Sequence, residues 1–263
     1  METYADQDTA TSDLLPNSVL GKAQLLLAAF ESGAVRLRLS ELSRRSGVPK
    51  ASAYRLAQEL VRWGLLDRHE ETYQLGMRLF HLGQRVPASA VLRSVAHPLL
   101  TDLFTRTRTT IHLAVLDDAH VLFLEKIAGE ANVLTHSQVG GRLPASCTAT
   151  GKVLLATVTG AREYSAGADL AVLTEQSVRS PDVLRRQLLI VRQQGYAHEV
   201  GEVRPGYASL AVPVAGPGAT TCAALSTTAP ISEVSVERLL PALRTTASRI
   251  TRALEAAAMP GVH

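Results

Sequence analysis

The segment from Leu37 to Gly64 constrains the fold most, because it predicts two short helices joined by a tight turn. Ser40 suits the N-cap of the first helix, and Gly47 supplies the residue that ends it. Pro49 sits where the first turn of a second helix tolerates it, and that helix extends to about Gly64. Such an arrangement is typical of a helix-turn-helix unit that reads DNA.

The second helix has two contrasting faces on a 3.6-residue wheel. The apolar face carries Ala53, Leu56, Leu60 and Trp63, and the opposite face carries Ala51, Tyr54, Arg55, Gln58 and Arg62. An ordinary solvated surface helix shows the same contrast, so the wheel alone leaves both interpretations open. Charge favours a phosphate-binding surface, because residues 36–62 hold seven basic and two acidic residues, whereas the whole chain carries a net charge of +3. We expect this basic face to be unpaired.

The flanking segments complete the unit. Residues 1–17 are acidic and polar, and we expect a disordered tail there. Residues 18–33 predict a third helix that ends at Gly33 and packs under the other two. Residues 65–76 predict a hairpin from which Arg68 could touch a phosphate, although the acids at its tip, Glu70 and Glu71, argue against deep insertion into the minor groove.

Short motifs run through this part of the chain at residues 18–23 (SVLGKA), 39–42 (LSEL), 47–50 (GVPK), 55–56 (RL) and 73–83 (YQLGMRLFHLG). Together with their spacing they resemble the IclR family of bacterial transcription regulators. The resemblance implies that the hairpin is the wing of a winged helix-turn-helix and that Arg55 is a recognition-helix arginine. It also implies that residues 77–86 form a linker helix, punctuated by Pro87.

The remaining chain predicts a mixture of helices and strands. We expect helices at 88–106, 150–157, 181–195 and 232–258, a hairpin around 117–118, a strand near 132–139, short helical turns at 160–180 and three strands between 195 and 230. In the first of these helices the inward residues should be Val91, Val95, Leu99, Leu100 and Leu103. Pro98 should kink that helix or lie in an irregular turn.

Two enzymatic patterns fail in the middle stretch. A phosphate-binding loop would need glycine at Ser146 and a hydroxyl residue at Val153, and a serine nucleophile three residues before Lys152 would need serine at Ala149. The resemblance offers another role, because VGGRLP at 139–144 and TATGKVLLA at 148–156 are similar to the effector-domain signature of the IclR family. It implies that Leu143, Pro144, Ala145 and Ala149 line an effector pocket.

The closing strands also resemble the family, through GYA at 195–197, GYASLAVPV at 206–214 and AALS at 223–226. One position departs from the pattern, since Ser209 stands where the family often has cysteine, so a pocket contact there would be a hydroxyl hydrogen bond. Ser226 and Thr228 would add hydroxyls. Glu199 and Glu202 could be an acid–base pair, although solvation or pairing with Arg204 is commoner, and the resemblance implies a third role in which Glu199 faces the ligand.

Other features carry less information. The histidines show no paired-ligand spacing, so we expect no metal and no cofactor, and we expect His112 and His136 to be packed or on the surface. Cys147 and Cys222 are simplest as small buried hydrophobes. The acidic N-terminus lacks a signal-peptide core and no apolar run is long enough to span a membrane, so we expect a cytoplasmic protein.

These observations predict an α+β protein. We expect a disordered tail at 1–17, a winged helix-turn-helix domain at 18–80, the end of a linker helix at 81–87, and a GAF-like α/β effector domain at 88–258. Base edges would meet Ser52, Tyr54 and Arg55, and phosphates would meet Arg44, Arg45, Lys50, Arg62 and Arg68.

Because one recognition helix makes few base contacts, we expect a homodimer or tetramer on an inverted-repeat operator. The protein would be a regulator and not an enzyme, more often a repressor. The family resemblance implies that a small organic acid or aromatic compound controls it. The alternative is a metabolite-sensing or enzymatic domain with a helical appendage for protein contacts.

Overall fold

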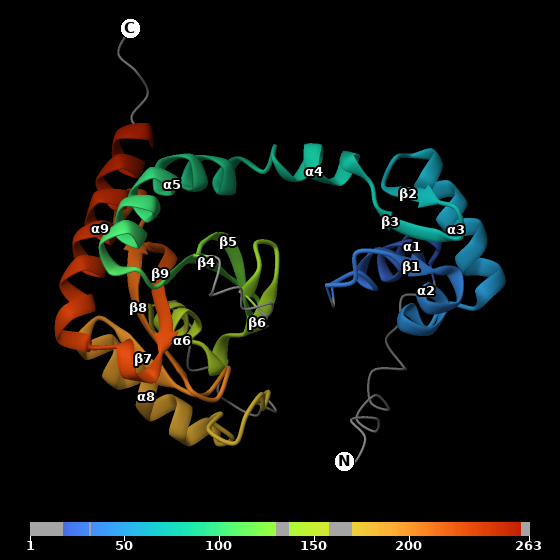
Figure 1. The fold of residues 1–263 in the computed structure, drawn as a ribbon. Coiled ribbons are helices and arrows are strands. Elements are labelled where there is room, and N and C mark those ends of the chain that lie inside the picture. The colour runs from blue at the N-terminus through green and yellow to red at the C-terminus, as the bar shows by residue number, and fades with distance from the viewer. Residues whose placement is uncertain (1–17, 32, 130–136, 158–169, 259–263) are drawn as a thin grey trace, which may run out of the picture. The chain divides into compact units, whose positions relative to one another are not determined.

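The computed structural model describes residues 18–31, 33–129, 137–157 and 170–258. The chain divides into two compact units between Val86 and Pro87 (Figure 1). Three sequence predictions lie wholly or partly outside the described residues: the tail at 1–17, the strand at 132–139 and the turns at 160–180. Among the described residues, no helix is both long and apolar enough to cross a membrane.

The described part of the N-terminal unit combines helices with a small antiparallel sheet. The helices are α1 (Val19–Ala28), α2 (Leu39–Ser46), α3 (Lys50–Arg62) and α4 (Met77–Gly83). The strands are β1 (Leu37–Arg38), β2 (Leu66–His69) and β3 (Thr72–Leu75), in the order β1-β3-β2. The predicted wing is therefore confirmed as the β2–β3 hairpin. Strand β1 was not predicted, because a two-residue strand is too short to show an alternating pattern.

The ends of α1, α2 and α3 differ from the sequence predictions, and the predicted linker helix ends at Gly83 rather than at residue 86. The N-cap of α2 is Arg38 and not Ser40, because the chain leaves β1 directly into the helix and the Arg38 N–H donates to the Glu41 carboxylate at 2.9 Å. Helix α1 ends at Ala28, before Gly33, and α3 ends at Arg62, before Gly64. Gly47 does end α2 in the left-handed conformation, with φ 68°.

The core of this unit joins the three helices to the sheet. Its buried side chains include Leu26, Leu37, Leu42, Ala53, Ala57, Leu60, Leu66 and Tyr73. Trp63 was expected on the inner face, but its side chain is 59% exposed. The helical wheel fails there because Trp63 is the C-cap, where the helix ends, and the buried residues of α3 are Ala53, Ala57 and Leu60.

The C-terminal unit is built on an antiparallel sheet in which the described strands have the order β6-β5-β4-β9-β8-β7 (Figure 1). The strands are β4 (Thr110–Asp117), β5 (His120–Ile127), β6 (Arg142–Pro144), β7 (Ala197–Val200), β8 (Tyr207–Ala215) and β9 (Thr221–Pro230). The predicted hairpin is confirmed, with Asp118 at φ 52° in its turn. The sheet joins two hairpin-rich halves through the pairing of β4 with β9.

Helices cover both faces of this sheet. The longer ones are α5 (Pro87–Thr107), α6 (Ala149–Thr157), α8 (Pro181–Gln194) and α9 (Val236–Ala258), and short 3-10 turns are η4 (Ala145–Cys147), η5 (Pro217–Ala219) and η6 (Ile231–Glu233). One core cluster packs α5 and α9 against residues such as Ile111 and Leu210, and a second packs α6 and α8 against residues such as Ala114 and Ala211. Alternate residues of each strand therefore serve different faces.

Two burial predictions in this unit are wrong. Val91 is 45% exposed, because the inner face of α5 runs through Leu92, Ala96 and Leu100. The small alanine in this stripe makes the apolar periodicity hard to recognise in the sequence. Pro98 lies inside α5. Cys147 is buried as expected, but Cys222, at the start of β9, is exposed.

Candidate functional site

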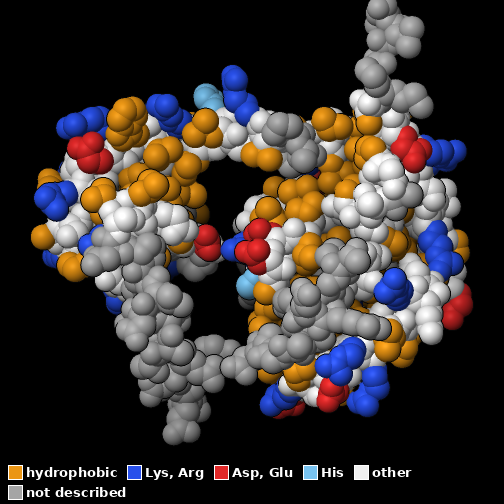
Figure 2. Space-filling model, turned by 180° about the vertical axis from the view of Figure 1, so that it is seen from behind, with side chains coloured by type: hydrophobic (Ala, Val, Ile, Leu, Met, Phe, Trp, Pro, Cys, Tyr) orange, Lys and Arg blue, Asp and Glu red, His pale blue; other side chains and the backbone are white. Residues whose placement is uncertain are grey.

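The outward face of α3 carries the side chains that the sequence assigned to it. Lys50, Ala51, Tyr54, Arg55 and Arg62 are exposed, whereas Ser52 and Gln58 are half-buried. On the neighbouring elements Arg44, Arg45 and Arg68 are also exposed. Figure 2 shows Lys and Arg side chains around the N-terminal unit, at the left of that view, with apolar side chains between them.

Arg62 and Arg68 are among the arginines that have protein partners, so the expectation of an unpaired basic face is wrong. Arg62 Nη1 lies 3.3 Å from Glu59 Oε1, one helical turn away. The Arg68 Nε donates to the backbone oxygen of Glu70 at 2.9 Å, which fixes the arginine across the tip of the wing. Exposed ion pairs contribute between zero and about 1 kcal/mol, so a phosphate could displace Glu59 from Arg62.

The described part of the C-terminal unit contains a pocket on the face of the sheet that α6 and α8 cover. The empty space is about 550 Å³, counting the part that opens to solvent. Six predicted residues line it: Leu143, Ala149, Glu199, Ser209, Ser226 and Thr228. Eight further residues line it as well: His112, Phe123, Ser137, Thr148, Thr150, Val203, Arg204 and Tyr207.

Two predicted pocket residues do not line the cavity. Pro144 pairs with His120 at the edge of the sheet, in β6. Ala145 is fully buried, and its backbone packs directly against Gly151, where an added Cβ would lie 2.2 Å from the Ala145 oxygen. The helix α6 therefore sits on the 145–147 turn, and this close contact brings its first residues to the pocket.

A row of polar side chains crosses the floor of the pocket. Glu199, Ser209 and Thr228 are cross-strand neighbours on β7, β8 and β9. The Ser209 and Thr228 hydroxyl oxygens are 2.9 Å apart, within hydrogen-bonding distance. His112 pairs with Ser226 in the adjacent row, on β4 and β9.

The imidazole of His112 is neutral. It is 2% exposed, and its Nε2 lies 2.9 Å from the Ser137 hydroxyl oxygen. Burial, with a smaller contribution from the charge of Lys126, lowers the pKa of His112 to about 3. His112 is packed, which is one of the two outcomes that the sequence prediction allowed, and its side chain also forms part of the pocket wall. His136 lies outside the described residues.

The opening of the pocket carries a cation–π pair. The Arg204 guanidinium lies 4.4 Å from the centre of the Tyr207 ring. Apolar walls come from Phe123, Leu143 and Val203. A largely apolar cavity with a few convergent polar groups is the usual build of a small-molecule site.

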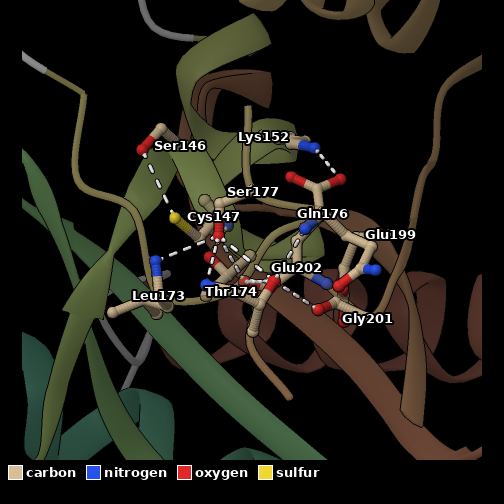
Figure 3. A network of polar contacts seen from close by, with 12 residues as sticks. Ser146, Cys147, Lys152, Leu173, Thr174, Gln176, Ser177, Glu199, Gly201 and Glu202 are labelled. Atoms are coloured by element: carbon tan, nitrogen blue, oxygen red, sulfur yellow. Dashed lines mark hydrogen bonds and ion pairs between the residues drawn. The ribbon is translucent and has the colours of Figure 1, made fainter. Parts of the chain in front are cut away.

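Behind the pocket wall lies a buried polar network (Figure 3). Lys152 is 2% exposed, and its Nζ lies 2.5 Å from Glu202 Oε1. The Glu202 N–H donates to Glu199 Oε2 at 3.0 Å, and the Ser177 hydroxyl donates to the Glu202 carbonyl at 2.8 Å. The network holds the loop after β7 against α6.

The two acids therefore have separate roles. Glu202 pairs with Lys152 and not with Arg204, and Glu199 is neither solvated nor ion-paired with Arg204, since it is 3% exposed and lines the pocket. Burial raises the pKa of Glu199 to about 7, against the opposing effect of hydrogen bonds from Ser209 and the Glu202 N–H.

Comparison with known proteins identifies both units. The model of the IclR helix-turn-helix domain matches residues 19–70, and the model of the bacterial transcriptional regulator IclR C-terminal domain matches residues 84–252. The chain belongs to the IclR family. It is a DNA-binding transcriptional regulator whose operator binding responds to a small molecule.

Several IclR-family relatives are similar over most of their length. The HTH-type transcriptional regulator XynR of Escherichia coli K12 is 34% identical over 210 residues, which cover 78% of this chain and 83% of that protein. The p-hydroxybenzoate hydroxylase transcriptional activator of Acinetobacter baylyi is 28% identical, covering 94% of both chains.

A solved structure shows the same fold. The crystal structure of an IclR homolog from Microbacterium hydrocarbonoxydans, complexed with 4-hydroxybenzoate, is 31% identical and has a TM-score of 0.82. The match covers 91% of this chain and 100% of that one. The α+β architecture predicted from the sequence, with a helix-turn-helix unit and an α/β unit, is confirmed.

Proposed function

We propose that this protein is a cytoplasmic homodimeric repressor that binds an inverted-repeat operator and is released by an organic acid bound in the pocket described above. The observation that carries the proposal is that one chain combines an exposed basic recognition helix with a polar-floored cavity, each in a unit that matches a domain model of the family. Each part of the proposal has its own support.

DNA is read by the outward face of α3. Tyr54 and Arg55 are exposed near the start of the helix, where a recognition helix meets base edges, and the half-buried Ser52 lies beside them. Lys50, Arg44, Arg45 and Arg62 meet phosphates, and Arg68 does so from the wing. Arg62 exchanges its weak partner Glu59 for a phosphate oxygen.

Dimer formation uses the apolar surface of α4. Met77, Phe80 and Leu82 are 62%, 57% and 53% exposed, which is unusual for three large apolar side chains in a seven-residue helix. A second copy would cover them and place two recognition helices on successive half-sites. A tetramer would need a second interface, different from the α4 surface that the dimer buries.

The effector is a small organic acid, with aromatic acids as the first class to test. The apolar walls suit a ring, the hydroxyl row suits polar substituents, and the positive end of α6 lines the pocket through Thr148, Ala149 and Thr150. An IclR homolog with the same fold binds 4-hydroxybenzoate.

Regulation, and not catalysis, is the activity of the pocket. Ser137 and His112 resemble a nucleophile and its base, at 2.9 Å. With a pKa of about 3, however, His112 is too weak a base to activate a hydroxyl at neutral pH.

Repression is the simpler mode of control, because a dimer on a promoter excludes polymerase without further contacts. A relative named as an activator makes activation the second candidate.

Fluorescence anisotropy on a duplex from the protein's own upstream promoter tests the proposal. We expect binding well above that of an unrelated duplex, a steep fall with salt, and release by 4-hydroxybenzoate or a related acid. Equal binding to both duplexes across the salt series would contradict sequence-specific reading by α3. A promoter–reporter assay separates the two modes, since deletion of the gene raises expression under a repressor and lowers it under an activator.

A further inference from the structure

The buried carboxyl group of Glu199 forms part of the pocket wall. Glu199 is 3% exposed, and its Oε2 accepts the Glu202 N–H at 3.0 Å. On the next strand Ser209 lies opposite Glu199 in register. Among the described residues, no ion pair involves the Glu199 carboxylate.

The charged groups around Glu199 do not neutralise it. Lys152 on α6 is the nearby buried cation, but its ammonium is bonded to Glu202, so those two charges cancel. Arg204 lies at the mouth, exposed and stacked on Tyr207. From β4, the pocket receives only the neutral imidazole of His112.

The balance of these effects places the titration of Glu199 in the physiological range. Burial is the main cause that raises its pKa from 4.5 to about 7. Hydrogen bonds from Ser209 and the Glu202 N–H oppose the rise, the charge of Glu202 supports it, and the charge of Lys152 opposes it. When Glu199 is ionised, an anion in the same cavity is repelled across a poorly solvated space. When Glu199 is protonated, its O–H is a hydrogen-bond donor to that anion.

We propose that the pocket takes up a monoanionic ligand together with one proton, and that Glu199 holds the proton. The inference rests on the proposed function, because it takes this pocket as the effector site. The proton comes from solvent, the ligand keeps its negative charge, and the neutral carboxyl of Glu199 faces it. Release from DNA then depends on pH as well as on the concentration of the acid.

Isothermal titration calorimetry of the full chain tests the coupling, with 4-hydroxybenzoate as the anionic probe and 4-hydroxybenzamide as its neutral isostere. A carboxyl group with this pKa is about 90% protonated at pH 6 and about 10% at pH 8, so the affinity for the anion should fall about ten-fold between them. The amide should bind with the same affinity at both pH values. Titrations at pH 7 in two buffers of different ionisation enthalpy should show net proton uptake with the anion only.

Two variants assign the proton to its site. Glu199→Gln keeps the shape of the protonated carboxyl, so it should bind the anion at pH 8 about as tightly as the wild type does at pH 6. Glu255→Gln changes an exposed acid on α9, which covers the opposite face of the sheet, and should keep the ten-fold dependence. A ten-fold dependence that persists in Glu199→Gln would remove Glu199 as the proton site.

The remaining outcomes separate the inference from the function on which it rests. Equal wild-type affinity for the anion at pH 6 and pH 8, with no proton uptake, overturns the inference and leaves the effector site standing. Benzoate serves as a second anionic probe. Binding of the amide but of neither anion at pH 6 also overturns the inference and leaves the effector site standing. Failure of all three probes to bind at pH 6 overturns the inference together with the choice of aromatic acids as effectors, while operator binding is judged separately by anisotropy.

Discussion

Replacing Lys152 by methionine tests whether the buried ion pair supports the pocket. Methionine has nearly the length of the lysine stem but no charge, so it leaves the Glu202 carboxylate buried with its ionic partner removed. The side chains of Lys152 and Glu202 are only 2% and 9% exposed, so solvent screens little of their interaction. Breaking a buried pair by removing one partner costs about 3–5 kcal/mol.

The pH dependence of this cost has a definite sign. Without Lys152 the pKa of Glu202, already raised by burial, rises further, so the folded variant binds a proton that the unfolded chain releases above about pH 4.5. Stability is then lost as the pH rises toward the folded pKa, and it returns as the pH falls. Between pH 7 and pH 5 the variant should regain up to about 2.7 kcal/mol relative to the wild type.

Urea unfolding followed by far-UV circular dichroism, at pH 7 and pH 5, measures both effects. Trp63, the chain's single tryptophan, reports the N-terminal unit separately through its fluorescence. The matched control is the double variant Lys152→Met, Glu202→Gln, which removes both charges and should cost less than half as much as the single change. A cost below about 1 kcal/mol for Lys152→Met at pH 7, or an equal cost for the double variant, would refute the reasoning.

Three further changes address other parts of the molecule. Gly151→Ala should lower the free energy of unfolding by about 3 kcal/mol in the same urea assay, because its Cβ would meet the Ala145 backbone oxygen at 2.2 Å; a neutral result would contradict the packing of α6 on that turn. Ser209→Leu should fill the pocket and abolish release by the effector while operator binding in anisotropy stays unchanged, and an unaltered effector response would remove Ser209 from the site. Tyr54→Ala should alter sequence preference across a set of mutated operators, whereas Arg62→Ala should weaken binding to every duplex and reduce the salt slope by about 0.9; the same uniform loss from both would refute the division into base and phosphate contacts.

The helices and their ends were largely predictable from the sequence, because capping residues and apolar periodicity are local features of the chain. Gly47 and Gly195 end helices in the left-handed conformation, as their positions indicated. Prediction failed where a helix ended or where a small residue held an inner position. Trp63 and Val91 were expected inside because they are large and apolar, but both are exposed, whereas Ala57 and Ala96, which the wheels left out, are fully buried.

The pocket was predictable only in part, since its residues meet through the register of distant strands. The sequence predicted six of its members, four of them within the family's motifs, but His112 and Phe123 became recognisable only when β4 took its place beside β9 and β5 its place beside β4. Strand alternation shows that His112 faces the same way as Ala114, yet it does not show which face is hollow. The pairing of Lys152 with Glu202, fifty residues away, likewise leaves no local signal.

The alternation of β8 and β9 has a consequence for how such regulators diversify. Ser209 and Ser226 face the cavity, while their neighbours Leu210 and Leu225 face the core under α5 and α9. In each of these strands, one set of alternate residues therefore determines which ligand binds, and the other set stabilises the fold. Duplicated copies of a gene with this design can acquire new effectors by substitutions at every second codon, while the intervening codons preserve the hydrophobic core.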